Sequence, residues 1–168
     1  MKPKQAGYSG TPLPQKLGIK DGHHVTLVGA PAGFALDAPG AVMHATLPKD
    51  PKLDVIVAFV TTRASLVAGL ATWRAHMQDA AGLWIAWPKK ASGIATDIVE
   101  QTIRDVALPT GLVDNKVCAI DETWSGLRLV IRREHRSSAP AARSRGTPRP
   151  SAARSRPARR GPRRAGTK

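Results

Sequence analysis

The stretch DVIVAFV at residues 54–60 decides the fold, because it is the clearest buried strand of the chain and a helix pattern follows it directly. In TRASLVAGLATWRAHMQDA, residues 62–80, large apolar side chains recur on one face of an amphipathic helix, at Leu66, Leu70, Trp73 and Met77. A second apolar strand, LWIAWP, follows at residues 83–88. Strand, helix and strand in this order predict a parallel sheet covered by helices.

Further elements extend this unit at both ends. Thr11 and the prolines of PLPQKLGIK predict a short helix, and strands are expected at HVTLVGA (24–30) and AVMHATL (41–47). A second helix is predicted from Asp97 to Leu108, where Asp97 and Glu100 have the spacing of a capping box. GLVDNKVCAID (111–121) and LRLVIRR (127–133), joined by ETWSG, predict a terminal antiparallel hairpin. The expected fold is therefore α/β, with a mostly parallel sheet.

The charge of the chain is concentrated at one end. Of the 26 lysines and arginines among 168 residues, 11 lie at 136–168, where no acid occurs, so residues 1–135 hold 15 basic and 12 acidic residues, a net charge of +3. We therefore divide the chain into a flexible arm (1–10), an α/β domain (11–135) and a disordered basic tail rich in arginine, alanine and proline (136–168).

The tail predicts weak, non-specific affinity for nucleic acid or for an acidic protein. Its absence of aromatic residues leaves open the alternative that it is only compositional drift. The arginines that would contact phosphates are Arg143, Arg145, Arg149, Arg154, Arg156, Arg159, Arg160, Arg163 and Arg164.

Cysteine and histidine point to no redox or metal chemistry. The single cysteine, Cys118, lies in an apolar strand and is expected to be an inert buried thiol. His23 and His24 have no matching ligands, so no metal site is predicted. The amino terminus lacks the apolar segment of a signal peptide, and no run is long enough to span a membrane, which together predict a cytoplasmic protein.

Three longer stretches resemble a bacterial family known as domain of unknown function 3052. They are YSGTPLPQKLGIKDG (8–22), WIAWPKKASGIATD (84–97) and VCAIDETWSGLRLVIR (117–132), and together they bracket residues 7 to about 133. In addition, the order of elements resembles the Rossmann-like fold of class I S-adenosylmethionine-dependent methyltransferases. The resemblance implies a fold, and it implies no catalytic residues.

The chain departs from the methyltransferase pattern at two places. Those enzymes follow the first strand with a turn such as D-x-G-x-G-x-G, whereas VGAPAGF (28–34) contains Pro31 and keeps only Gly29 and Gly33. They also end the second strand with an acidic residue, and here no acid follows before Asp50. The helix between these strands has shrunk to a few residues. On these grounds no cofactor is expected, and S-adenosylmethionine is argued against.

Ligands of open parallel sheets bind beyond the carboxyl ends of the strands. Loops that follow four predicted strands meet there, and they supply the candidate ligand-binding residues Lys89, Lys90, Ser92, Gly93, Thr96, Asp121, Glu122, Trp124 and Ser125. The two lysines before a helix amino terminus could bind an anion, or they could pair with Asp121 and Glu122. Trp124 could contact a ligand or only cover the end of the sheet. No residue is assigned a catalytic role.

Three functions stay open at this stage. The leading hypothesis is a non-catalytic, regulatory binding domain that recognises a small anionic ligand or an acidic partner at this rim. The alternative is a divergent transferase of the methyltransferase type that uses the same rim. An exposed patch of tryptophans would instead indicate a scaffold for other proteins. A deep pocket beside GAPAGF (29–34), large enough for a nucleoside, would favour the transferase.

Overall fold

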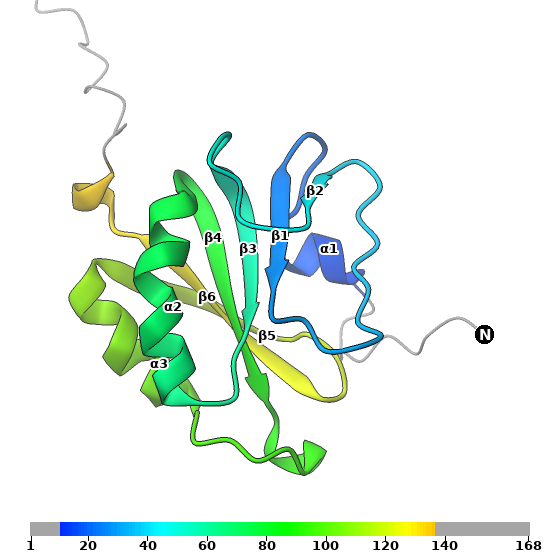
Figure 1. Ribbon diagram of the computed structural model, residues 1–168, viewed down its shortest axis with the longest axis vertical. Coiled ribbons are helices and arrows are strands. Elements are labelled where there is room, and N and C mark those ends of the chain that lie inside the picture. Colours follow the sequence, from blue (N-terminus) through cyan, green and yellow to red (C-terminus); the bar gives the residue numbers. More distant parts are fainter. Residues whose placement is uncertain (1–10, 137–168) are drawn as a thin grey trace, which may run out of the picture.

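The computed structural model describes residues 11–136, so the predicted arm and the tail arginines named above lie outside the described residues (Figure 1). The helices are α1 (Leu13–Lys16), α2 (Arg63–His76) and α3 (Glu100–Ala107). The strands are β1 (His24–Val28), β2 (Val42–His44), β3 (Leu53–Phe59), β4 (Met77–Pro88), β5 (Leu112–Ala119) and β6 (Trp124–Ile131). Short 3₁₀ helices lie at Lys90–Ser92 (η1), Leu108–Thr110 (η2) and Arg133–His135 (η3).

The strands form one six-stranded sheet in the order β2-β1-β3-β4-β6-β5. β2, β1, β3 and β4 are parallel, and β6 runs antiparallel to its neighbours β4 and β5. The predicted α/β class, with a mostly parallel sheet and a terminal antiparallel hairpin, is therefore confirmed. β3 and β4 lie in the centre, where both faces are covered, and this explains why they are continuous apolar runs.

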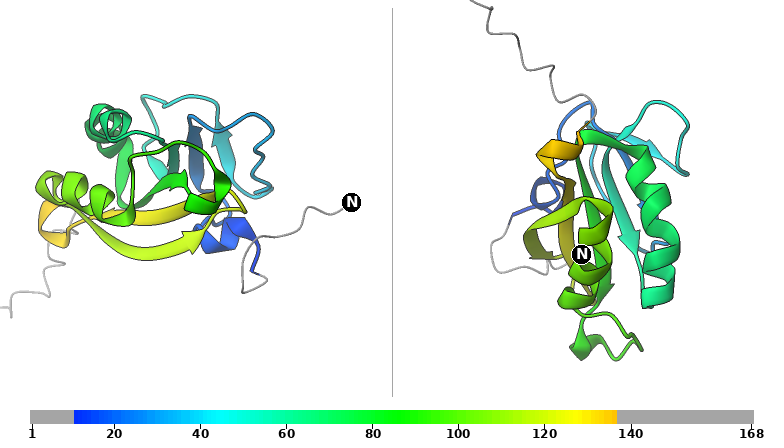
Figure 2. Two further views of the ribbon diagram at one scale, coloured as in Figure 1. Left: turned by 90° about the horizontal axis from the view of Figure 1, so that it is seen from below. Right: turned by 90° about the vertical axis from the view of Figure 1, so that its left-hand side faces the viewer.

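The two faces of the sheet are covered unequally. α2 and α3 pack on one face over a cluster that includes Leu66, Leu70 and Ile103, and Figure 2 shows α1 on the opposite side. That opposite face holds a second cluster around Trp84, Phe59 and Trp124, which α1 and the loop between β1 and β2 cover. No helix lies in this loop, whereas the sequence indicated a helix shortened to a few residues.

Two predicted helix boundaries were wrong. Met77 was placed on the apolar face of α2, but it begins β4 and pairs with Leu53 of β3. Met77 is buried, which agrees both with the apolar face of a helix and with a buried strand. Hydrophobic periodicity alone therefore could not tell whether Met77 ends the helix or begins the strand. The helix predicted from Asp97 begins at Glu100, with the Thr102 hydroxyl accepting a hydrogen bond from the Val99 amide. Asp97 serves a different helix, as described below.

The order of strands reverses between β1 and β3, since the chain passes from β1 to β2 on one side and returns to β3 on the other. The carboxyl ends of β1, β3 and β4 share one edge, as the pairs Val28–Ala58 and Ala58–Ile85 show. β5 runs parallel to β4, so the β5–β6 turn reaches the same edge. Ligands of open α/β sheets bind at such a reversal.

Candidate functional site

A cavity of about 660 Å³ opens at this edge, on the α1 face of the sheet. Four segments line it: residues 11–16 around α1, the loop at residues 31–37, Ile94 from the β4–α3 connection, and the β5–β6 turn at residues 120–124. These segments lie far apart in the sequence, and the parallel strands bring their ends together. The site is therefore a product of the strand order.

Aromatic side chains support the wall between the loop and the hairpin. The rings of Phe34 and Phe59 lie edge to face with centroids 4.8 Å apart, and Phe59 meets Trp124 in the same way at 5.1 Å. Phe34 and Trp124 both line the cavity, while Phe59 lies behind them as part of the core. Edge-to-face packing of this kind holds rings in defined orientations, so this wall is preformed.

The opposite wall, α1, is fastened to the sheet through Trp84. Its indole Nε1 donates a buried hydrogen bond of 3.1 Å to the carbonyl oxygen of Leu17, the residue that follows α1. A helix of four residues has little stability of its own. Its position therefore depends on this bond and on the burial of Leu17.

Three charged residues line the cavity, Lys16, Asp37 and Asp121. One Asp121 oxygen accepts hydrogen bonds from the amides of Thr123 and Trp124, each at 2.7 Å, so this carboxylate shapes the hairpin turn. Asp37 is exposed and forms no side-chain hydrogen bond or ion pair with any described residue. Asp37 thus offers two carboxylate oxygens to a ligand.

Two glycines shape the loop after β1. Gly29 has φ +65°, and a Cβ added there would lie 3.1 Å from the carbonyl oxygen of Phe59. Gly33 has φ +80° and no atom within 4 Å of an added Cβ, so its backbone faces open space at the cavity. The loop therefore keeps a backbone that a ligand can approach closely, even though Pro31 interrupts the expected glycine pattern.

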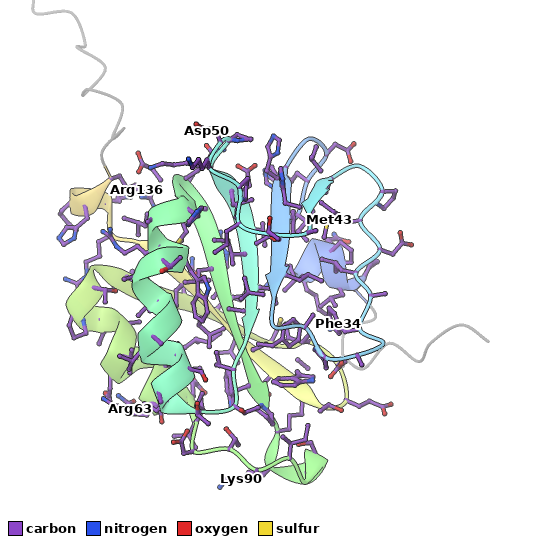
Figure 3. The ribbon with its side chains drawn as sticks, in the orientation of Figure 1. Phe34, Met43, Asp50, Arg63, Lys90 and Arg136 are labelled. Carbon is purple, nitrogen blue, oxygen red and sulfur yellow. The ribbon has the colours of Figure 1, made fainter. Side chains whose placement is uncertain are left out.

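The lysine loop is not part of this cavity. Lys89, Lys90, Ser92, Gly93 and Thr96 do not line it, and Figure 3 places Lys90 at the tip of the connection, away from Phe34. The Ser92 hydroxyl donates to the carbonyl of Lys89 at 2.6 Å, and the Thr96 hydroxyl donates to that of Thr61 at 2.6 Å. Both hydroxyls therefore hold the connection in shape.

Neither expected arrangement around the lysines forms. The described ion pairs both involve Arg104, with Glu100 and Asp114, so Lys89 and Lys90 do not pair with Asp121 or Glu122. The helix amino terminus expected behind them is also displaced, because α3 begins seven residues after Gly93, at Glu100. Asp97 instead accepts a hydrogen bond of 2.7 Å from the Arg63 amide at the start of α2. Its carboxylate complements the dipole of that helix.

The hairpin residues divide between the cavity and the sheet. Asp121 and Trp124 line the cavity, whereas Glu122 is exposed outside it and Ser125 pairs with Trp87 and Ala119 within the sheet. Trp124 is buried against Phe59, so it closes the end of the sheet and forms cavity wall at the same time. The sequence left open whether Trp124 contacts a ligand or only covers the end of the sheet, and this position allows both.

Sequence reasoning placed the segment 29–34, which contains Phe34, at this rim, but it did not select α1 or Asp37, which also line the cavity. One available signal was the acid in LDAPG, which comes before the second strand instead of at its end. A second was Thr11, interpreted as a helix start and as part of an arm that could fold over the rim. The N-cap of α1 is Pro12, and Thr11 lines the cavity.

Cys118 and the histidines lie outside the cavity. Burial raises the pKa of the Cys118 thiol, and the nearby Lys116 and Lys16 oppose this shift. His24 Nδ1 and His44 Nε2 lie 2.9 Å apart in a hydrogen bond between β1 and β2. Within residues 11–136, no group of three or more metal-binding side chains occurs. In the same residues, no helix has the length and apolar character to cross a membrane.

No family model matches the chain, and no curated protein matches it, so its membership of domain of unknown function 3052 stays a prediction. Among solved structures, the methylase of ribosomal protein L11 from Lactobacillus delbrueckii matches with 12% identity, 71% of this chain, 75% of that chain and a TM-score of 0.48. Fibrillarin from Aeropyrum pernix, with natively bound S-adenosylmethionine, matches with 13% identity, 71% of this chain, 69% of that chain and a TM-score of 0.43.

Magnesium protoporphyrin IX methyltransferase from Synechocystis, with bound S-adenosylmethionine, matches with 12% identity over 55% of this chain and a TM-score of 0.41. This chain spans only 46% of that structure. The three matches describe a similarity of fold. They correct one expectation: the argument against S-adenosylmethionine is overturned, because two of them are proteins of similar fold with that cofactor bound.

Proposed function

We propose that the cavity binds a nucleoside-bearing ligand and that the protein is a divergent transferase of the methyltransferase type, with S-adenosylmethionine as its first candidate ligand. One observation carries the proposal: a cavity of about 660 Å³ lies directly beside the loop at residues 31–37. Pockets for small ligands and cofactors are typically of roughly 300–1,000 Å³, with apolar walls and a few polar groups. The cavity has this size and this composition.

The residues present fit the parts of such a ligand. Asp37 supplies a carboxylate that could accept hydrogen bonds from ribose hydroxyls. It would take the place of the acidic residue that methyltransferases carry at the end of the second strand. Phe34, Leu13 and Ile94 supply apolar surface for a base. Lys16 offers a positive charge for the carboxylate of an amino-acid moiety. Gly33 leaves its backbone open to close approach.

S-adenosylmethionine, when bound, would supply a methyl group on a sulfonium to an acceptor. The protein's contribution to such a transfer is mainly to bind and orient the two reactants. The preformed aromatic wall of Phe34 and Trp124 and the α1 wall would serve that purpose. Because the cavity is open to solvent along the exposed loop, an acceptor could enter from the same side.

A specific observation also supports a second candidate, a binding domain without catalysis. One oxygen of Asp121, which lines the cavity, accepts hydrogen bonds from the amides of Thr123 and Trp124, so this carboxylate is committed to the structure of the rim. Such a rim would suit a domain that binds a ligand but transfers no group from it. The two candidates share the cavity and differ only in turnover.

Calorimetric titration of the full chain with S-adenosylmethionine, S-adenosylhomocysteine, adenosine and inorganic phosphate tests the proposal. We expect the three nucleosides to bind and phosphate not to bind. Asp37→Asn should weaken binding by roughly 10- to 100-fold, the value of a charge-assisted hydrogen bond. Asp50→Asn is the matched control, since Asp50 is also exposed and lies outside the cavity (Figure 3).

Each outcome has a distinct meaning. Absence of binding by all three nucleosides would refute the proposal. Equal losses in Asp37→Asn and Asp50→Asn would remove Asp37 from the site. Binding of S-adenosylmethionine without methyl transfer to protein, nucleic-acid or small-molecule acceptors would favour the non-catalytic domain.

A further inference from the structure

The charged residues that line the cavity leave it with one net negative charge. Lys16 contributes a positive charge, whereas Asp37 and Asp121 each contribute a negative one. None of the three forms an ion pair with a described residue, because both ion pairs within residues 11–136 involve Arg104. Their charges therefore remain available to a ligand. A ligand with a net positive charge is electrostatically complementary to this cavity.

Of the two acids, Asp121 is the one whose carboxylate is held in a fixed position. Its Oδ1 accepts hydrogen bonds of 2.7 Å from the amides of Thr123 and Trp124, while its Oδ2 forms no hydrogen bond with any described residue. Asp121 is partly buried, whereas Asp37 is exposed. A charge beside a low-dielectric wall interacts more strongly than a charge in open solvent. Asp121 should therefore attract a charged ligand more strongly than Asp37 does.

Aromatic side chains line the same cavity as this carboxylate. Trp124, whose amide donates to Asp121, and Phe34 both belong to the cavity wall. Aromatic rings attract cations through the negative faces of their π-systems, and aromatic cages recognise quaternary ammonium groups in this way. A sulfonium is a cation of the same kind, because its charge lies on an alkylated atom. A fixed carboxylate together with two aromatic side chains therefore suits a ligand with an alkylated cationic centre.

We propose that Asp121 is a specificity-determining residue, which makes the cavity prefer S-adenosylmethionine, with its sulfonium, over S-adenosylhomocysteine, whose thioether is neutral. The two ligands share the adenine, the ribose and the amino-acid group, and they differ only in the methyl group and the charge that it confers on sulfur. The inference rests on the proposed function, because it requires the cavity to bind nucleosides of this kind. Such a preference favours exchange of the demethylated product for fresh ligand.

Calorimetric titration of the full chain measures this preference with three ligands: S-adenosylmethionine, S-adenosylhomocysteine and sinefungin, in which a protonated amine replaces the sulfonium. We expect the wild type to bind both charged ligands roughly 10-fold more tightly than S-adenosylhomocysteine, the value of one charge pair that is partly screened by solvent. Asp121→Asn should abolish most of this preference, and it should do so by weakening the charged ligands while the affinity for S-adenosylhomocysteine stays nearly the same.

The variants separate charge from structure. In Asp121→Asn the asparagine side-chain oxygen can accept the same two amide hydrogen bonds, so the turn is kept while the charge is lost. Glu122→Gln is the matched control, since Glu122 is the adjacent acid, is exposed and does not line the cavity. Asp37→Asn should weaken both natural ligands alike, because both carry the ribose. The preference is a ratio of two affinities measured on one preparation, so incomplete folding of a variant cancels from it.

Failure of this inference and failure of the proposed function give different results. Absence of binding by every nucleoside would overturn both. Equal affinity of the wild type for S-adenosylmethionine and S-adenosylhomocysteine would overturn the inference alone, and so would an unchanged preference in Asp121→Asn. Binding of sinefungin only as tightly as S-adenosylhomocysteine would show that charge is not what the cavity recognises. An equal fall in preference in Asp121→Asn and Glu122→Gln would also refute the role of Asp121, because the preference would then follow the net charge of the chain.

Discussion

Replacing Trp84 with phenylalanine tests how the α1 wall of the cavity is held. Trp84 is fully buried in the centre of the sheet, and its indole donates the hydrogen bond to Leu17 described above. Phenylalanine keeps an aromatic ring in the core but cannot donate this bond. The variant therefore isolates one contact between α1 and β4.

Two costs add to the expected loss of stability. The smaller ring leaves unfilled space, which costs about 1–2 kcal/mol by comparison with other large-to-small changes in protein cores. The carbonyl oxygen of Leu17, whose residue is only 1% exposed, also loses its donor, at about 1–3 kcal/mol. We expect the free energy of unfolding to fall by about 2–5 kcal/mol in Trp84→Phe.

Trp87→Phe provides the matched control. Trp87 lies on the same strand and is buried, but its indole forms no hydrogen bond with any described residue. Its loss should be limited to the packing cost of about 1–2 kcal/mol. Urea unfolding followed by far-ultraviolet circular dichroism measures both variants without dependence on tryptophan fluorescence. Equal destabilisation of the two variants would refute the role of the Leu17 bond.

Two further predictions concern the loop after β1 and the thiol of β5. Gly29→Ala should lower the free energy of unfolding more than Gly33→Ala. Both residues have positive φ, but only at Gly29 would an added Cβ lie 3.1 Å from a backbone atom, the carbonyl oxygen of Phe59. Equal losses of stability in urea unfolding would contradict this contact. Burial raises the pKa of Cys118, so the folded chain keeps this proton at a pH where the unfolded chain has released it, and stability should fall as pH rises above the ordinary cysteine value of about 8.5. Between pH 7.5 and 9.5, wild-type protein should therefore lose more stability than Cys118→Ala, and identical losses would show that the thiol does not contribute.

The cavity follows from the unequal covering of the sheet. α2 and α3 bury one face, whereas a four-residue helix and a loop cover part of the other. Where the loop and α1 leave a gap at the carboxyl edge, the cavity opens. The shortened connection between β1 and β2 is thus central to the proposed function.

The cavity opens at the edge of the sheet where the sequence placed the candidate site, but only some of the predicted residues line it. Hydrophobic strands alternating with a helix implied a parallel sheet, and a parallel sheet implied a rim at its carboxyl ends. Asp121 and Trp124 were identified in this way and do line the cavity. Lys89 and Lys90 were selected for their charge, yet the chain turns at Gly93, whose φ is +73°, and the lysines lie outside the cavity. Asp37 was overlooked because its place at the cavity depends on how a loop without regular structure folds back.

By itself, the sequence determined the type and order of the elements, because hydrophobic period, turn residues and helix signals act between residues close in the chain. It also determined where charge concentrates, since the excess of arginine after residue 135 needs no structure to be seen. Only the tertiary structure decided which side chains meet. Asp97 contacts the start of α2 across 34 residues, Trp84 contacts Leu17 across 67, and Arg128 faces Lys116 because of strand register. Such contacts arise when the whole sheet assembles, and no local pattern records them.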